Sequence, residues 1–154
     1  PMVVDADALR LLAITPQRRD DWVLTPHPGE ARLLLGLGAS ELNARRVNTA
    51  VQLQQRYGGS VVLKGVGSVV ASAGSTPPAV CCNGNPGMAS GGMGDALTGV
   101  IAGLLAQGMG LRDATETGVC LHAAAADAAA LAGGERGLLA GDLVDQLRGL
   151  VNPQ

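Results

Sequence analysis

The most informative segment of the sequence reads Asn83-Gly84-Asn85-Pro86-Gly87-Met88-Ala89-Ser90-Gly91-Gly92-Met93-Gly94-Asp95-Ala96-Leu97-Thr98-Gly99. Its glycine-rich half crowds backbone N–H groups together and leads into an apolar helical sequence over residues 96–105. The start of a helix carries a partial positive charge and free N–H donors, which suit an anion and above all a nucleotide phosphate. Asp95 places one carboxylate beside that anion. The segment therefore predicts chemistry on a phosphoryl group or on a hydroxyl next to it.

This glycine loop differs from the two best-known phosphate-binding motifs. No Gly-Lys-Ser/Thr triplet follows it, as a Walker A motif requires, and no Gly-x-Gly-x-x-Gly sequence opens directly from a strand. A simpler interpretation stays open, in which the segment is a surface loop and Asp95 is the N-cap of the next helix. The length and composition of the run favour a binding loop, because a cap does not need them.

Composition limits the class of protein. The 154 residues fit one domain, 1–154, that is large enough for a core. Hydrophobic residues make up 47% of the chain, yet it holds no Phe, one Trp and one Tyr, so the core must be Leu, Val, Ile and Ala. A formal net charge of −2 and the scarcity of aromatic residues exclude nucleic acid as a partner. No apolar run reaches the roughly 20 residues that span a bilayer, so we expect no membrane partner.

The start of the chain and its cysteines indicate its context. The chain opens on Pro1, with no initiator methionine and no signal-like segment, so we expect a piece of a longer polypeptide. Cys81 and Cys82 are adjacent and Cys120 lies in a helical sequence, which gives neither a disulfide framework nor metal-ligand spacing. Reduced, structural thiols are typical of a cytoplasmic protein, and that is the location we expect.

Short apolar runs alternate with amphipathic segments along the chain. The runs predict strands over residues 2–4, 22–24, 60–64, 66–71 and 79–82. The amphipathic and Ala-rich segments predict helices over residues 6–13, 31–35, 40–57, 95–107, 112–132 and 141–150. This alternation is typical of an α/β fold built in layers.

A second glycine-containing segment, Lys64-Gly65-Val66-Gly67-Ser68, lies between two of the predicted strands. A lysine at the end of a central strand is costly to bury unless an anion or an acid meets it. The two glycines let the backbone approach a phosphate, and the Ser68 hydroxyl can donate to one. A tight hairpin turn with a solvated lysine explains the same residues equally well.

A third segment, Thr25-Pro26-His27-Pro28-Gly29-Glu30, follows one predicted strand and precedes a helix, which is where ligands bind in α/β sheets. Its two prolines stiffen the chain around His27, which is either a ligand contact or a surface histidine. Glu30 suits the first turn of the helix. Asp5 and Asp7, after the first strand, are either caps or side chains that face the same cleft as His27. His122 on its Ala-rich helix is expected to be structural.

Together these segments resemble the NAD(P)H-hydrate dehydratase family, whose domain has the ribokinase-like fold. The resemblance covers nearly the whole chain and rests on the runs at residues 4–9, 24–30, 62–65 and 85–95. It implies a three-layer αβα sandwich. The family domain is longer and begins with strands and helices that this chain lacks, so we expect the C-terminal portion of such a domain. His27-Pro28-Gly29-Glu30 stands where kinases of this fold often carry Asn-x-x-Glu, which favours the dehydratase branch.

The resemblance implies repair of NADHX or NADPHX, in which the nicotinamide ring is hydrated. ADP, or ATP, phosphorylates the ring hydroxyl, and loss of phosphate regenerates NADH or NADPH. Asp95 matches the catalytic acid of the family. Asp95 and His27 both match residues that contact the hydrated dinucleotide. The residues that match nucleotide-binding positions are Lys64, Gly65, Val66, Gly67, Ser68 and Gly94. Family members use Mg²⁺, for which we expect nucleotide oxygens and water as ligands and no protein metal site.

Two other functions stay open. One is a ribokinase-like kinase of a small hydroxylated vitamin precursor, and the other is an inactive nucleotide-binding fragment. In many bacteria the family domain is fused to an epimerase that acts on the same damaged cofactor, and we expect that domain in the parent chain. Sheet edges left by the missing strands promote association, so we also expect a homo-oligomer.

Overall fold

The computed structural model describes residues 1–37, 45–74 and 77–152. Within these ranges five strands form one sheet in the order β1-β2-β3-β4-β5. The first three run parallel, whereas β4 and β5 are antiparallel to their neighbours. The strands are β1 (Met2–Val4), β2 (Trp22–Leu24), β3 (Ser60–Leu63), β4 (Ser68–Ser72) and β5 (Ala79–Cys81). The carboxyl ends of β1, β2 and β3 therefore meet at one edge of the sheet.

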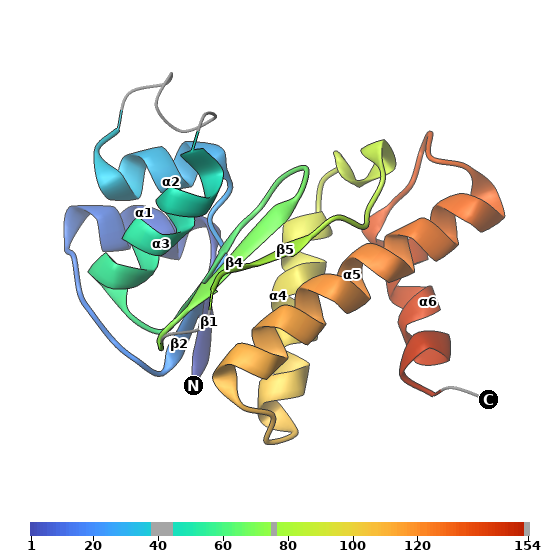
Figure 1. Ribbon diagram of the computed structural model, residues 1–154. Helices are drawn as coiled ribbons and strands as arrows, with labels where there is room; N and C mark the ends of the chain where they lie inside the picture. The colour runs from blue at the N-terminus through green and yellow to red at the C-terminus, as the bar shows by residue number, and fades with distance from the viewer. Residues whose placement is uncertain (38–44, 75–76, 153–154) are drawn as a thin grey trace.

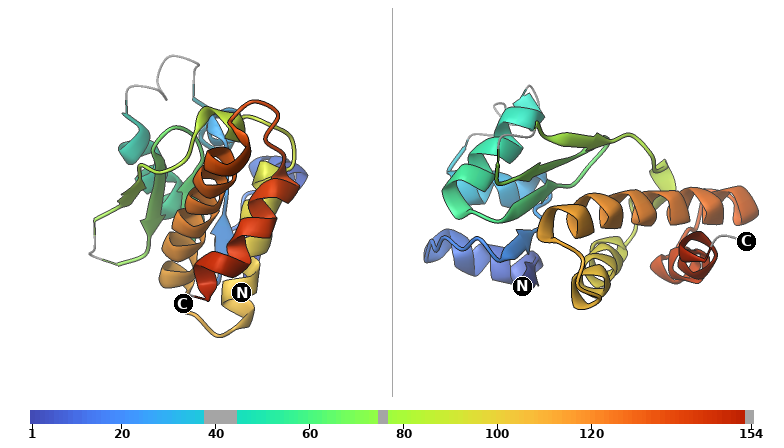
Figure 2. Two further views of the ribbon diagram at one scale, coloured as in Figure 1. Left: turned by 90° about the vertical axis from the view of Figure 1, so that its right-hand side faces the viewer. Right: turned by 60° about the horizontal axis from the view of Figure 1, so that its bottom comes forward.

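Helices cover both faces of this sheet, which makes three layers (Figures 1 and 2). One face carries α1 (Ala6–Ile14), α2 (Pro28–Leu35) and α3 (Arg46–Tyr57). The other carries α4 (Met93–Ala106) and α5 (Leu111–Gly133), and a 3₁₀ turn, η2 (Pro86–Met88), precedes α4. The last helix, α6 (Ala140–Val151), packs on α5 at the end of the molecule that lies away from the sheet (Figure 1).

Alternate residues of the central strands supply the two halves of the core. In β2, Trp22 and Leu24 face α1–α3, while Val23 between them faces α4 and α5. This follows from the two-residue period of a strand and requires apolar side chains on both faces. The helices on the second face pack closely, since a Cβ at Gly118 of α5 would lie 2.6 Å from Cγ1 of Ile101 in α4.

Several predicted boundaries were wrong. Helix α2 begins at Pro28, three residues before the predicted start, because His27 caps it. The predicted strand over 66–71 begins only at Ser68, because residues 64–67 form the hairpin turn. Helix α4 begins at Met93 rather than at Asp95. The helix predicted from residue 40 is observed from Arg46, and residues 40–44 of that prediction lie outside the described residues.

Two further findings concern membranes and cysteines. No helix in the described ranges combines the length and the apolar character needed to cross a bilayer. Cys81, Cys82 and Cys120 are free cysteines.

Candidate functional site

An ion pair lies at the carboxyl edge of the sheet. The ammonium of Lys64, which follows β3, is 2.8 Å from Oδ1 of Asp5, which follows β1. The Thr98 hydroxyl of α4 donates to Oδ2 of the same carboxylate over 3.4 Å. The two charged side chains are only 20% and 12% exposed. Lys64 is thus met by an acid, as a lysine at the end of a buried strand requires.

Asp5 directs its carboxylate into this cluster and not to its own helix. It occupies the N-cap position of α1 but makes no side-chain capping bond there. Asp5 is therefore the N-cap residue by position, as predicted, whereas its side chain bonds to Lys64 and Thr98 and not to the first turn of α1.

Gly94 lets the ion pair approach the first turn of α4. A Cβ at this position would lie 3.3 Å from both Oδ2 of Asp5 and Nζ of Lys64. The segment that contains Gly94 is therefore in contact with the end of β3, as the sequence predicts for two parts of one site. The glycine also has a packing role that the sequence analysis missed.

Asp95 is the third residue of α4 and is exposed. The helix is capped by Gly92, which has a left-handed backbone with φ of 84°. The interpretation of Asp95 as the N-cap is therefore wrong. The carboxylate stands in the first turn of a helix of 14 residues, one residue after the glycine that contacts the ion pair.

The segment from Lys64 to Ser68 forms the hairpin between β3 and β4. Gly65 and Gly67 take positive φ angles of 141° and 66°. The Ser68 hydroxyl donates to the Gly65 carbonyl over 3.1 Å, and the apolar Val66 is fully exposed at the turn. The hairpin therefore presents backbone and one apolar side chain to the surface.

Arg46 braces this hairpin from α3. One terminal guanidinium nitrogen lies 3.2 Å from the Leu63 carbonyl oxygen and 3.3 Å from those of Lys64 and Gly67. A Cβ at Gly65 would lie 2.9 Å from the other terminal nitrogen, so the glycine makes room for the guanidinium. Sequence reasoning missed Arg46, because it precedes the hairpin by 18 residues and lies on the polar face of its helix.

His27 is the N-cap of α2. Its Nδ1 accepts from the backbone N–H groups of Gly29 at 2.9 Å and Glu30 at 3.3 Å. Glu30 completes a capping box, because its Oε2 accepts from the His27 N–H over 2.8 Å. The ring is 54% exposed and Nε2 lies 3.5 Å from Oε1 of Glu30. A capping role is established by these bonds, and a substrate contact for the exposed ring stays a prediction.

His122 joins α5 to the start of α4. Its Nε2 is 2.9 Å from the carbonyl oxygen of Met93, and the side chain is buried. Burial lowers the pKa of His122, the nearby charge of Lys64 lowers it further, and the Met93 carbonyl opposes the shift. The neutral ring donating through Nε2 fits this environment, as expected for a structural histidine.

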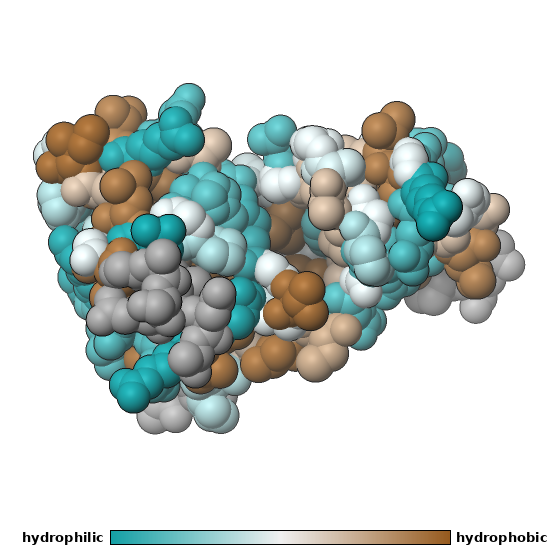
Figure 3. All heavy atoms as spheres, turned by 90° about the horizontal axis from the view of Figure 1, so that it is seen from above, coloured by the Kyte–Doolittle hydropathy of each residue, from teal (hydrophilic) through white to brown (hydrophobic). Residues whose placement is uncertain are grey.

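Figure 3 views the molecule from above, and hydrophilic and hydrophobic residues are mixed on this side. Backbone N–H groups of α4, the hairpin backbone and the Lys64 ammonium fit the anionic part of a nucleotide. Within the described residues no three His, Cys, Asp or Glu side chains are grouped so as to hold a metal ion.

A family model described as NAD(P)H-hydrate dehydratase matches residues 1–148. The chain belongs to the NAD(P)H-hydrate dehydratase family. This confirms the family that the four sequence runs indicated.

Curated proteins of the dehydratase family are similar over nearly all of the chain. The chain is 54% identical over 153 residues to the bifunctional NAD(P)H-hydrate repair enzyme Nnr of Coxiella burnetii, covering 99% of the chain and 31% of that protein. It is 40% identical over 159 residues to the ADP-dependent (S)-NAD(P)H-hydrate dehydratase of Neisseria meningitidis, covering 99% of the chain and 53% of that protein. The chain thus spans between about a third and about half of the length of these two dehydratase relatives.

Solved structures of the dehydratase family share the fold. The ADP/ATP-dependent NAD(P)H-hydrate dehydratase of Bacillus subtilis, co-crystallised with ATP and Mg²⁺ and soaked with CoA, matches with a TM-score of 0.84 and 31% identity. That match covers 96% of this chain and 54% of the other. A hydroxyethylthiazole kinase from Pyrococcus horikoshii matches with a TM-score of 0.75 at 18% identity, which shows a shared fold alone. The predicted ribokinase-like fold is confirmed.

Proposed function

We propose that the protein containing this chain dehydrates NADHX and NADPHX to NADH and NADPH with ADP or ATP as phosphoryl donor. Family membership supports the reaction class. The observation that carries the proposal for this chain is the convergence of Lys64, Gly94 and the adjacent Asp95 at the carboxyl edge of the sheet. A cation, free helix N–H groups and an exposed carboxylate are what phosphoryl transfer to a hydroxyl requires.

In the proposed mechanism Asp95 is the general base. Its exposed carboxylate takes the proton of the ring hydroxyl while that oxygen attacks the terminal phosphorus of the nucleotide. The bond between that phosphorus and the bridging oxygen of the nucleotide breaks, and the nucleotide leaves with one phosphate fewer. Phosphate then departs with the former hydroxyl oxygen, and loss of a proton from the neighbouring ring carbon restores the double bond.

The nucleotide phosphates are proposed to lie between the start of α4 and the hairpin of residues 64–68. Gly65, Gly67 and Gly94 allow close approach of the backbone, and the Ser68 hydroxyl could donate to a phosphate by turning away from the Gly65 carbonyl. Lys64 stabilises charge on the transferred group, held in place by Asp5. Mg²⁺ would be bound mainly by nucleotide oxygens and water and would neutralise phosphate charge.

Three properties of the whole protein follow as proposals. Similarity to bifunctional repair enzymes supports a fused epimerase domain in the parent chain. The parallel edge strand β1 has one partner, β2, among the described strands, which supports association with further strands or another copy. We also propose that the protein acts in the cytoplasm, where NADH and NADPH are used.

The test is regeneration of NADH by the full-length natural protein. With NADHX and ADP as substrates we expect NADH absorbance to appear together with inorganic phosphate and AMP. Asp95→Asn should lower kcat by about 10³-fold, the scale of general-base catalysis. Asp7→Asn, which changes a side chain that is 93% exposed, is the matched control and should leave the rate unchanged.

Other outcomes of this assay would indicate a different function. A stable phosphorylated small molecule without release of phosphate would identify a kinase. Binding of ADP without any turnover would support an inactive nucleotide-binding role for this chain. An Asp95→Asn protein as active as the natural one would remove Asp95 from the mechanism.

A further inference from the structure

Helix α5 holds the beginning of the glycine loop through one carboxylate. Oδ2 of Asp127 accepts from the Gly84 N–H over 2.9 Å, and Oδ1 accepts from the Asn85 amide over 2.9 Å. The Asn85 side-chain oxygen in turn accepts from the Gly87 N–H over 3.0 Å. Both carboxylate oxygens of Asp127 and the side-chain oxygen of Asn85 therefore accept a bond, and Asn85 passes the contact from Asp127 on to Gly87.

The same helix holds the end of the loop. His122, five residues before Asp127 on α5, is bonded through Nε2 to the Met93 carbonyl at 2.9 Å. Met93 lies two residues before Asp95. Between these two anchors the Ser90 hydroxyl donates to the Leu138 carbonyl over 2.9 Å, beyond the end of α5.

Packing leaves the loop little freedom to move between these bonds. A Cβ at Gly87 would lie 2.4 Å from the backbone oxygen of Glu135, so only glycine fits there without displacement of backbone. Gly84 takes a φ of 110°, which side-chain-bearing residues rarely adopt. The conformation of the loop is thus set by α5 and the segment after it.

We propose that Asp127, acting with Asn85, is a positioning residue that fixes the loop leading to Asp95, with His122 as the second anchor. This inference rests on the proposed function, in which Asp95 is the base. A general base must lie within hydrogen-bonding distance of the proton it takes, and a displacement of about 1 Å lowers rates by roughly 10²-fold. Release of the loop should therefore lower kcat far more than it changes KM.

The test uses a side-chain exchange in the full-length natural protein. Asp127→Asn places an amide against either the Gly84 N–H or the Asn85 amide, and kcat should fall by roughly 10- to 100-fold with KM for both substrates changed less than about threefold. Asn85→Asp places a second carboxylate against that of Asp127, and it should lower kcat by a similar factor. The double variant N85D/D127N restores all three bonds, because the amide of residue 127 can donate to the carboxylate of residue 85 while both backbone N–H groups keep their acceptors. It should recover kcat to within about threefold of the natural protein.

A second readout does not depend on turnover. Hydrogen–deuterium exchange of peptides covering residues 83–92 should be faster in Asp127→Asn and should return to the natural rate in N85D/D127N. If the natural protein regenerates no NADH, the proposed function fails while exchange still decides whether Asp127 holds the loop.

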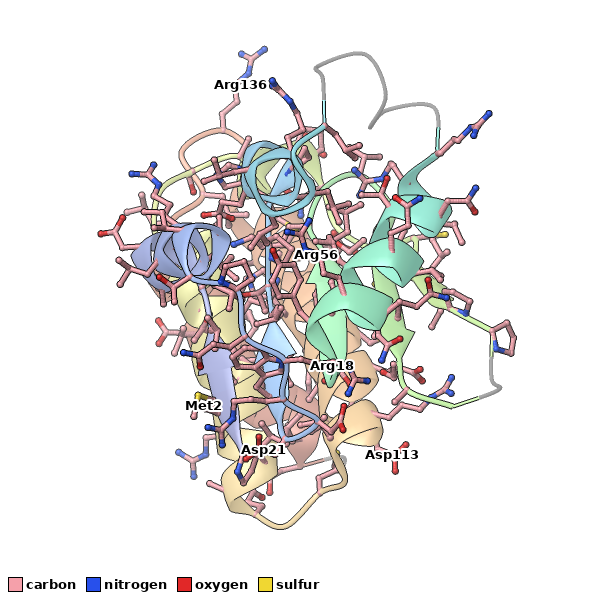
Figure 4. All side chains as sticks on the ribbon, turned by 90° about the vertical axis from the view of Figure 1, so that its left-hand side faces the viewer. Met2, Arg18, Asp21, Arg56, Asp113 and Arg136 are labelled. Atoms are coloured by element: carbon pink, nitrogen blue, oxygen red, sulfur yellow. The ribbon has the colours of Figure 1, made fainter. Side chains whose placement is uncertain are left out.

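Asp113→Asn is the matched control, because it makes the same change in the first turn of the same helix. Figure 4 shows Asp113 at the edge of the molecule opposite to Arg136, which follows the other end of α5. This variant should change neither kcat nor exchange. An unchanged kcat and exchange rate in Asp127→Asn, or a double variant no better than the single ones, would overturn the inference.

Discussion

At the scale of single residues, the Asp5–Lys64 pair determines how the candidate site holds its positive charge. A largely buried pair is a poor source of net stability, since the desolvation of both ions offsets their attraction. Its value lies in geometry: Asp5 and Thr98 keep the Lys64 ammonium beside Gly94. The distribution of charge at this edge is therefore built into the fold before any ligand binds.

Removal of one partner of this pair should destabilise the protein more than removal of both. Lys64→Met leaves the Asp5 carboxylate without its cation and should lower the free energy of unfolding by about 3 kcal/mol. The double variant D5N/K64M should lose clearly less, because no unmatched charge remains at the site. Urea unfolding followed by circular dichroism measures both values. A loss in the double variant equal to the sum of the losses in Lys64→Met and Asp5→Asn would show that the pair is not coupled.

At the scale of elements, α2 shows how a residue can serve its helix and still present a surface to a ligand. The His27 ring caps the helix through Nδ1, while more than half of the side chain remains exposed. The Lys64 N–H donates to the Pro26 carbonyl over 2.9 Å, so the segment that carries His27 is bonded to the start of the hairpin. Capping and the proposed substrate contact are therefore separable by substitution.

Two substitutions distinguish the two roles of His27. His27→Ala removes the cap and should lower the free energy of unfolding by about 1 kcal/mol. His27→Asn keeps a good capping side chain and removes the ring, so stability should change by less than about 0.5 kcal/mol. If the ring contacts the hydrated dinucleotide, His27→Asn should still raise KM for NADHX about tenfold, the equivalent of one hydrogen bond. An unchanged KM would leave His27 with the capping role alone.

The sequence predicted the type of each strand and α-helix better than its ends, and the reasons are local. The 3₁₀ turn η2 was not predicted. Apolar runs such as Val61-Val62-Leu63 identify buried strands, and glycine clusters identify the loops. The start of α2 was missed because a histidine rarely caps a helix, so no Ser, Thr, Asp or Asn marked the boundary. Strand β4 was begun too early because Val66 is apolar, yet it lies exposed at the turn.

Side chains that act across the fold were not predictable in the same way. Arg46 and Asp127 reach the hairpin and the glycine loop from helices remote in sequence, and neither forms part of a local motif. The partners of Arg46 are backbone carbonyls, and one of the two partners of Asp127 is a backbone N–H, so the sequence carries no matching pattern of side chains. Asp5 was predicted as one of two alternatives, since a strand end is near both a helix start and the cleft.

At the scale of the whole molecule, the buried His122 links stability to pH. Its pKa is lowered in the folded protein, chiefly by burial and also by Lys64, from the ordinary value near 6.5. The unfolded chain therefore binds a proton more readily than the folded one. The contribution of His122 to stability is present above about pH 6.5 and is lost progressively as pH falls below it.

The free energy of unfolding should accordingly rise between pH 5 and pH 7. The slope from one histidine is at most about 1.4 kcal/mol per pH unit. His122→Gln cannot titrate, so its unfolding free energy should depend less on pH over this interval. Urea unfolding at several pH values measures both proteins, and parallel curves would exclude His122 as the group responsible.

The single tryptophan of the sequence has a consequence for how this molecule can be observed. Trp22 is 4% exposed and its indole N–H donates to the Tyr57 carbonyl over 3.0 Å, at the amino end of β2. Its fluorescence should be blue-shifted and shielded from acrylamide. Because the candidate site lies at the other end of the strands, that emission should report unfolding of the sheet. It should not change when nucleotide binds.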